Sequence, residues 1–143
     1  MIAYGLKQTF GEYIHCFFAE PTHAPCMLLG LATGKHEKIS CRDIGIDGKT
    51  AADGLAVGRP SPLVSNVAES IIEGAYTVDD SQLMPLTENL FENENIYIEP
   101  SACASFPGIM HIIQSEEYGG IMENAVHIFW ATGGSMVPVE LRF

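Results

Sequence analysis

The chain has 143 residues, 47% hydrophobic and 17% charged, a composition typical of one folded domain with a buried core rather than of a disordered segment. The formal net charge is −11 and the seven lysines and arginines are scattered, which argues against a nucleic-acid-binding surface. No uncharged apolar stretch approaches the roughly 20 residues of a membrane-spanning helix, and no signal-peptide pattern stands at the N-terminus. We therefore expect one cytoplasmic domain that binds neither nucleic acid nor membrane.

The first part of the chain predicts a strand, a short helix and a long loop. Residues 14–19 form a continuous apolar run with aromatic side chains, typical of a strand buried on both faces of a parallel sheet. Residues 25–33 predict a helix that ends at Gly34. Residues 34–60 hold five glycines and no periodicity, so we expect a long loop, and such loops are usually functional or disordered.

The middle of the chain predicts the best-defined helix. Ser61 is a favourable N-cap and Pro62 suits the first helical position, after which apolar residues recur at helical spacing until Gly74. Residues 75–78 are a weaker strand candidate. Residues 80–93 predict another helix, and we expect Pro85 to displace its start or to kink it.

The last part continues the alternation. Residues 96–98 and 126–130 read as two more buried strands, and residues 101–117 predict a helix that Pro107-Gly108 interrupts. Alternating strands and helices imply βαβ crossovers, so the fold class we expect is α/β, a three-layer αβα sandwich with a mainly parallel sheet.

Polar or glycine-rich turns follow three of the expected strands. Ligands of such sheets bind at the carboxyl ends of the strands, and the residues there are Glu20, Glu99 and Thr132. We therefore expect these side chains to line one crevice. In the long loop, Asp53-Gly54 marks a turn that suits a ligand-facing position.

Glu20, His23 and Cys26 leave three interpretations open. A carboxylate, an imidazole and a thiol within seven residues could bind a transition metal, although their spacing matches no common zinc pattern. One carboxylate with turn carbonyls suits an ion that prefers oxygen. Alternatively, Glu20 caps the helix that begins near Pro25.

Other common catalytic signatures are missing from the sequence. It contains no dinucleotide-binding or Walker loop, no nucleophile elbow and no HExxH motif. The four cysteines form no CxxC pair, and nothing argues for a disulfide framework. No lysine has an apolar setting suited to Schiff-base chemistry, as the sequence around Lys7, Lys35, Lys38 and Lys49 shows.

Several longer strings, in order along nearly the whole chain, resemble the D-serine dehydratases. They are residues 18–30 (FAEPTHAPCMLLG), 43–47 (DIGID), 50–61 (TAADGLAVGRPS), 98–102 (IEPSA) and 130–138 (WATGGSMVP). The last two also resemble the wider group of serine and threonine dehydratases, serine racemases and threonine synthases. The resemblance implies the fold-type II (tryptophan synthase β-like) architecture of pyridoxal-phosphate enzymes, in agreement with the α/β pattern.

The resemblance also implies roles for particular residues. Thr132 matches the hydroxyl that meets the pyridine nitrogen of pyridoxal phosphate, and Gly54 matches a loop glycine whose backbone passes close to the ring. Glu99 matches an acidic residue beside the ring, and Gly133 lets the backbone approach the cofactor. Three residues match positions that surround a monovalent cation such as K⁺ or Na⁺ in related enzymes. Glu20 would contribute its carboxylate, and Ala24 and Cys26 their main-chain oxygens.

The family's Schiff-base lysine and phosphate-binding loop match nothing in this sequence. Residues 4–11 resemble the helix that follows that loop, so we expect residues 1–143 to be a single C-terminal segment of the catalytic domain, with the lysine upstream of Met1. The parent reaction would convert D-serine to pyruvate and ammonia. Alone, the chain is expected to be inactive. The alternative is a non-catalytic lobe that self-associates through an exposed sheet edge or apolar face, or pairs with a separate N-terminal half.

Overall fold

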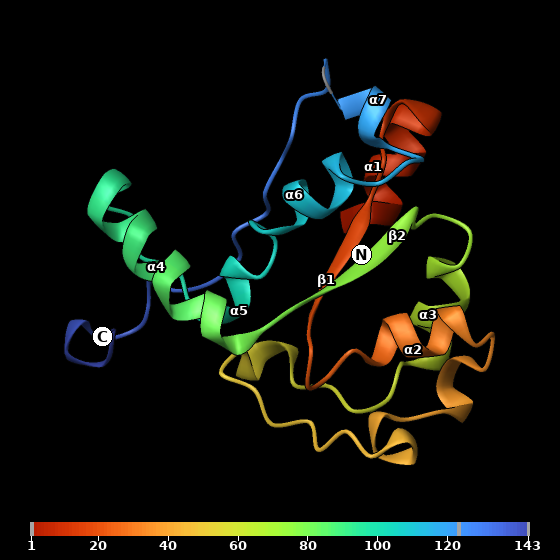
Figure 1. Cartoon of the computed structure of the whole chain (residues 1–143), viewed down its shortest axis with the longest axis horizontal. Coiled ribbons are helices and arrows are strands. Elements are labelled where there is room, and N and C mark those ends of the chain that lie inside the picture. The colour runs from red at the N-terminus through yellow and green to blue at the C-terminus, as the bar shows by residue number, and fades with distance from the viewer. Residues whose placement is uncertain (1, 123, 143) are drawn as a thin grey trace.

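The computed structural model describes residues 2–122 and 124–142, and its sheet confirms the α/β prediction. Two parallel strands, β1 (Phe17–Pro21) and β2 (Gly74–Val78), pair with Phe17 opposite Gly74 and Pro21 opposite Val78. Figure 1 shows the strands crossing the middle of the molecule, with α2 and α3 to one side and α6 and α7 to the other. A parallel pair needs a crossover connection, which here runs from Thr22 to Glu73.

Seven α-helices occur in the described residues. They are α1 (Ile2–Phe10), α2 (Cys26–Ala32), α3 (Pro62–Ala68), α4 (Asp80–Glu94), α5 (Pro100–Cys103), α6 (Gly108–Ile113) and α7 (Gly119–Met122). The helices expected at residues 25–33 and 80–93 are confirmed, as are the start at Pro62 and the break at Pro107-Gly108. α3 ends at Ala68, earlier than expected, and Gly74 is the first residue of β2 rather than the end of the helix.

The expected displacement of the start of α4 by Pro85 is wrong. The helix begins at Asp80 and runs through Pro85. Its start is fixed upstream, since the Asp79 carboxylate accepts the Ser81 N–H at 3.0 Å and the Ser81 hydroxyl at 2.6 Å. An N-cap of this kind stabilises the first turn, and Pro85 lies beyond that turn, so the proline does not set where the helix begins.

Two of the expected strands are also corrected. Residues 96–98 and 126–130 are extended segments outside any ladder. The turns that follow them meet, since the Glu99 N–H donates to the Gly133 carbonyl at 3.2 Å. The second is not buried on both faces, because Val126 is 89% and Ile128 67% exposed. Local sequence can favour an extended backbone, but a ladder also needs a neighbouring strand in register.

The core lies where the sheet meets the start of α4 and the turn before α6. Val78 and Leu83 are fully buried with Ala52 and Ala104, and Tyr76 packs against them. A second cluster joins Ile98 and Cys103 to one side of α4. Within residues 2–122 and 124–142, no helix has the length and apolar character needed to cross a membrane.

Candidate functional site

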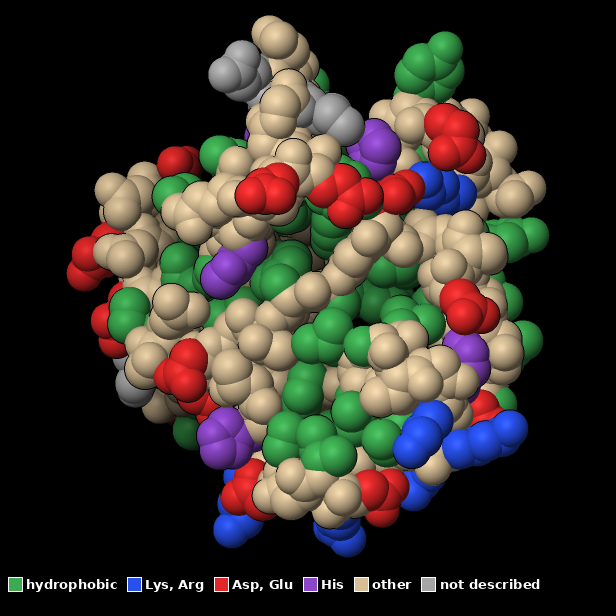
Figure 2. Space-filling view, turned by 45° about the vertical axis from the view of Figure 1, so that its right-hand side comes forward, with side chains coloured by type: hydrophobic (Ala, Val, Ile, Leu, Met, Phe, Trp, Pro, Cys, Tyr) green, Lys and Arg blue, Asp and Glu red, His purple; other side chains and the backbone are tan. Residues whose placement is uncertain are grey.

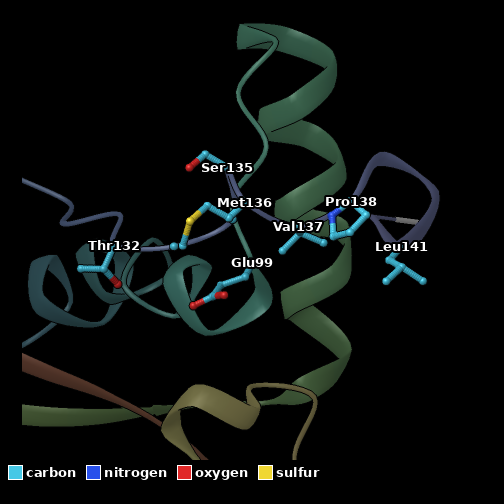
Figure 3. Close-up of a pocket in the computed structure, with 9 residues that line it drawn as sticks. Glu99, Thr132, Ser135, Met136, Val137, Pro138 and Leu141 are labelled. Atoms are coloured by element: carbon cyan, nitrogen blue, oxygen red, sulfur yellow. The ribbon is translucent and has the colours of Figure 1, made fainter.

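A cavity of about 640 Å³ opens where the turn after residues 126–130 meets the N-terminal end of α5. Figure 3 shows the Glu99 side chain below Met136, with Thr132 to one side and Val137, Pro138 and Leu141 to the other. The lining residues are Glu99, Thr132, Gly133, Gly134, Ser135, Met136, Val137, Pro138 and Leu141. Two of the three strand-end residues expected to share one crevice, Glu99 and Thr132, therefore do so.

Gly54, from the long loop, lies against the Glu99 turn, although it is not among the residues that line the cavity. It stands in the short 3-10 turn η4 (Asp53–Leu55), which Leu55 anchors to the core beside Val78. The Gly54 N–H donates to the Ser101 hydroxyl at 3.0 Å. A side chain at position 54 would meet that hydroxyl at 3.0 Å and a carboxylate oxygen of Glu99 at 3.9 Å. Residue 54 therefore lies against the same turn that supplies Glu99 to the cavity.

Gly133 and Gly134 let residues 132–134 approach the Glu99 turn closely. At Gly133 a Cβ atom would overlap the Glu99 carboxylate. Gly134 has φ 126°, and a Cβ there would lie 2.5 Å from the Ile98 Cα and 2.7 Å from the Glu99 nitrogen. Only glycine combines this backbone conformation with this approach. The glycine pair thus brings Thr132 beside Glu99.

The far wall of the cavity is held by contacts that the sequence did not suggest. Arg142 donates from Nε to the Val137 carbonyl at 2.9 Å, and its guanidinium lies 5.0 Å from the Tyr97 ring centre. Phe129 stacks on Phe106 at 5.0 Å. The roles of Ser101 and Arg142 were missed, because each depends on a contact between segments far apart in the sequence.

The chemistry of the lining suits a neutral aromatic ring more than an anion. Its polar side chains are the Glu99 carboxylate and the hydroxyls of Thr132 and Ser135, and Met136 and Leu141 provide apolar surface. No lysine or arginine is among the lining residues, so a phosphate group would find no cationic partner there. The Thr132 side chain is exposed at the cavity.

Glu20 is absent from the lining of this cavity. Its carboxylate accepts the Met27 N–H at 2.8 Å and the Leu28 N–H at 2.7 Å, in the first turn of α2. Burial raises the pKa of the Glu20 carboxyl, and these two amides partly offset that rise because they stabilise the charged form. The geometry is that of the helix cap which the sequence left open as one interpretation.

The zinc interpretation has no support in the described residues, where no group of three His, Cys, Asp or Glu side chains is arranged to hold a metal ion. His23 turns away to the Asp47 carboxylate at 3.1 Å. The Cys26 thiol is buried beside Glu20, and burial raises its pKa to about 12, so it is held as a neutral thiol. The Ala24 carbonyl accepts the Cys26 N–H at 3.0 Å. A monovalent cation at Glu20, Ala24 and Cys26 stays a prediction.

Comparisons with known proteins identify the family of the chain. Residues 2–130 match a family described as pyridoxal-phosphate dependent enzymes. Probable D-serine dehydratases from Geobacillus kaustophilus and Bacillus subtilis are each 53% identical, over 96% and 97% of this chain. The match covers 33% and 32% of those proteins, so the chain spans about a third of the length of the curated relatives it matches.

Solved structures show the same fold. Maize serine racemase superimposes with a TM-score of 0.69 at 22% identity, over 82% of this chain and 35% of the racemase. The processed form of a threonine deaminase from Solanum lycopersicum gives 0.61 at 20% identity, over 76% of this chain and 28% of the deaminase. The resemblance seen in the sequence is confirmed, and the chain belongs to the family of pyridoxal-phosphate-dependent enzymes.

Proposed function

We propose that this chain contributes the cofactor-ring side of a D-serine dehydratase, in which D-serine is converted to pyruvate and ammonia by β-elimination. The observation that carries the proposal is the meeting of three distant segments at the Glu99 turn. Thr132 lines one cavity with Glu99, and the Gly54 N–H bonds to the Ser101 hydroxyl beside it. The probable D-serine dehydratases that are 53% identical to the chain support the choice of substrate.

The residues present fit the pyridine ring of pyridoxal phosphate. Thr132 offers a neutral hydroxyl at the cavity, and a neutral partner leaves a ring nitrogen unprotonated, whereas a carboxylate would favour its protonation. The Gly54 backbone and Gly133 would flank the ring, with Glu99 beside it. When bound, the cofactor supplies an electron sink for charge that develops at the substrate α-carbon.

The same residues do not suffice for the whole reaction. None of the four lysines lines the cavity, so this chain offers no amine there to hold the cofactor or to remove the α-proton. No basic side chain lines it to neutralise the phosphate. We therefore expect the isolated chain to bind pyridoxal phosphate weakly and to leave D-serine unchanged.

Complementation tests the proposal. The chain is mixed with pyridoxal phosphate and a separately produced segment comprising the other two thirds of the Geobacillus kaustophilus relative, and pyruvate is measured with D-serine and, as control, L-serine. We expect pyruvate from D-serine with the mixture and from neither piece alone. Thr132→Val, which keeps the side-chain shape without the hydroxyl, should lower the rate at least about tenfold. A mixture whose two pieces co-elute but form no pyruvate would refute the proposal.

A second candidate function, self-association as a non-catalytic lobe, is favoured by residues 126–130. Val126, Ile128 and Trp130 are exposed while His127 and Phe129 between them are partly covered, so the outward side of this extended segment is apolar. Figure 2 shows hydrophobic side chains open to the surface on one face of the molecule. An unpaired extended segment of this kind is a template for pairing.

Size-exclusion chromatography with light scattering tests self-association. We expect a dimer that Ile128→Asp converts to monomer, whereas Leu63→Asp, at a similarly exposed site on α3, leaves it intact. A wild-type monomer at high concentration would contradict this candidate.

The cytoplasmic location and the K⁺ or Na⁺ site also remain predictions. A rise in the melting temperature of the chain with KCl but not with choline chloride would support the cation site.

A further inference from the structure

The long loop reaches the Glu99 turn through η4, where the Gly54 N–H donates to the Ser101 hydroxyl. Inside η4 the backbone closes on itself, with the Leu55 N–H donating to Ala52 and the Ala56 N–H to Asp53. Leu55 and Ala52 pack in the core, but Gly54 itself is exposed. The bond from the Gly54 N–H to the Ser101 hydroxyl joins this turn directly to the element that carries Glu99.

Ser101 is well placed to act as a fixed acceptor. It follows Pro100, which begins α5. The Ala102 and Cys103 N–H groups donate to the Glu99 carbonyl at 2.9 and 3.2 Å, and both side chains are buried. A serine hydroxyl on a short side chain within a packed turn loses little freedom when it accepts a hydrogen bond.

We propose that Ser101 is a positioning residue of the cofactor site, whose hydroxyl holds the Gly54 amide and keeps the loop backbone against the Glu99 turn. The inference rests on the proposed function for its cofactor role. Gly54 and Glu99 then keep a fixed separation before the ring enters, and Ser101 acts through Gly54 without contacting the ring. Without the hydroxyl, η4 stays anchored by Leu55 but its Gly54 backbone moves more freely beside the Glu99 turn.

Amide hydrogen exchange of the ¹⁵N-labelled chain, without cofactor, tests the hydrogen bond. In Ser101→Ala we expect exchange at Gly54 to become about fivefold faster, the size expected for one lost hydrogen bond. Ser101→Thr, which keeps a hydroxyl, should restore the wild-type rate. Ser105→Ala is the matched control, because it removes a nearby hydroxyl that bonds only within its own turn, to the Ala102 carbonyl at 3.4 Å. The Thr22 amide, bonded to Val78 across the strand ends, is the reference for global opening.

Equal exchange at Gly54 in the wild type and Ser101→Ala would overturn the proposal. Faster exchange at Thr22 as well, or the same change in Ser105→Ala, would also overturn it, because the effect would then be general loss of stability. The cofactor role is tested by titrating the chain with pyridoxal phosphate and following the Gly54 and Thr132 amide shifts. We expect the dissociation constant to rise about fivefold in Ser101→Ala and to recover in Ser101→Thr.

The hydrogen bond of Ser101 and its role in cofactor binding can be refuted separately. A wild-type chain whose Gly54 and Thr132 amides do not respond to millimolar pyridoxal phosphate refutes the proposed cofactor site, and with it the cofactor role of Ser101. The exchange comparison still decides whether Ser101 holds the loop. An unchanged dissociation constant in Ser101→Ala, with exchange at Gly54 accelerated, overturns the cofactor role alone.

Discussion

Gly134→Ala should detach the turn that carries Thr132 from the Glu99 turn. The new Cβ would lie 2.5 Å from the Ile98 Cα and 2.7 Å from the Glu99 nitrogen, both backbone atoms that cannot rotate aside. Overpacking of this kind costs about 1–3 kcal/mol, and a non-glycine residue at φ 126° adds about 1–3 kcal/mol. Separation of the two segments avoids the clash and sacrifices mainly the bond from the Glu99 N–H to Gly133, about 1 kcal/mol. Separation of the two turns therefore costs less free energy than keeping them in contact.

Two glycines provide matched controls. Gly58→Ala meets open space and carries no positive φ, whereas Gly45→Ala meets open space at φ 82°, so it isolates the conformational cost from the clash. Trp130, the only tryptophan, lies four residues before Gly134 and reports on the turn through its fluorescence. We expect Gly134→Ala alone to change the Trp130 emission while the urea midpoint falls by the equivalent of only about 1–2 kcal/mol. Emission and midpoint equal to those of the wild type would refute the close approach.

Three further predictions concern other regions. At pH 8 a thiol reagent should modify half-buried Cys16 much faster than Cys26, whose thiol pKa of about 12 keeps it neutral, and equal rates before unfolding would contradict this. Lys7 lies 2.6 Å from Glu73 and lowers the pKa of that carboxyl, so the pair should contribute about 1 kcal/mol above pH 4.5 and lose it as the pH falls further. Urea midpoints of Glu73→Gln should vary less than wild type between pH 7 and 3. Glu20→Ala removes both acceptors from α2 and should lower the unfolding free energy by about 1–2 kcal/mol by urea titration, whereas no change would exclude the cap.

The sequence predicted helices better than strands because helix signals are local. Ser61-Pro62 and the Pro107-Gly108 break act within one turn, and the structure follows them. Residues 75–78, the weakest strand candidate, do form β2, whereas residues 126–130, apolar and β-branched, stay outside the sheet. A run of apolar residues records what one segment favours, but pairing depends on which other segment lies alongside.

The candidate site was predictable where it depends on residue types that are recognisable in the sequence, such as paired glycines. The sequence predicted that Thr132-Gly133-Gly134 and Glu99 meet because each follows an expected strand; those two strands do not form, but the cavity still joins the two turns. Glu20 was expected beside them but its carboxylate is bound to α2, an alternative that the same residues allowed. Ser101 bonds to Gly54 across 47 positions, and the Arg142 guanidinium lies over the ring of the sequence-distant Tyr97, so no spacing rule predicts these contacts.

The register of the sheet also governs how a newly made chain acquires its structure. Phe17 on β1 pairs with Gly74 on β2, almost sixty residues later. At a synthesis rate of roughly 5–20 residues per second, β1 would leave the ribosome roughly 3–12 seconds before its neighbour. Throughout that interval Phe17 and Phe18 lack their β2 partner, and sequence-distant parallel pairing is intrinsically slow. We therefore expect β1 to keep its apolar side chains exposed, and open to non-native contacts, until β2 is made.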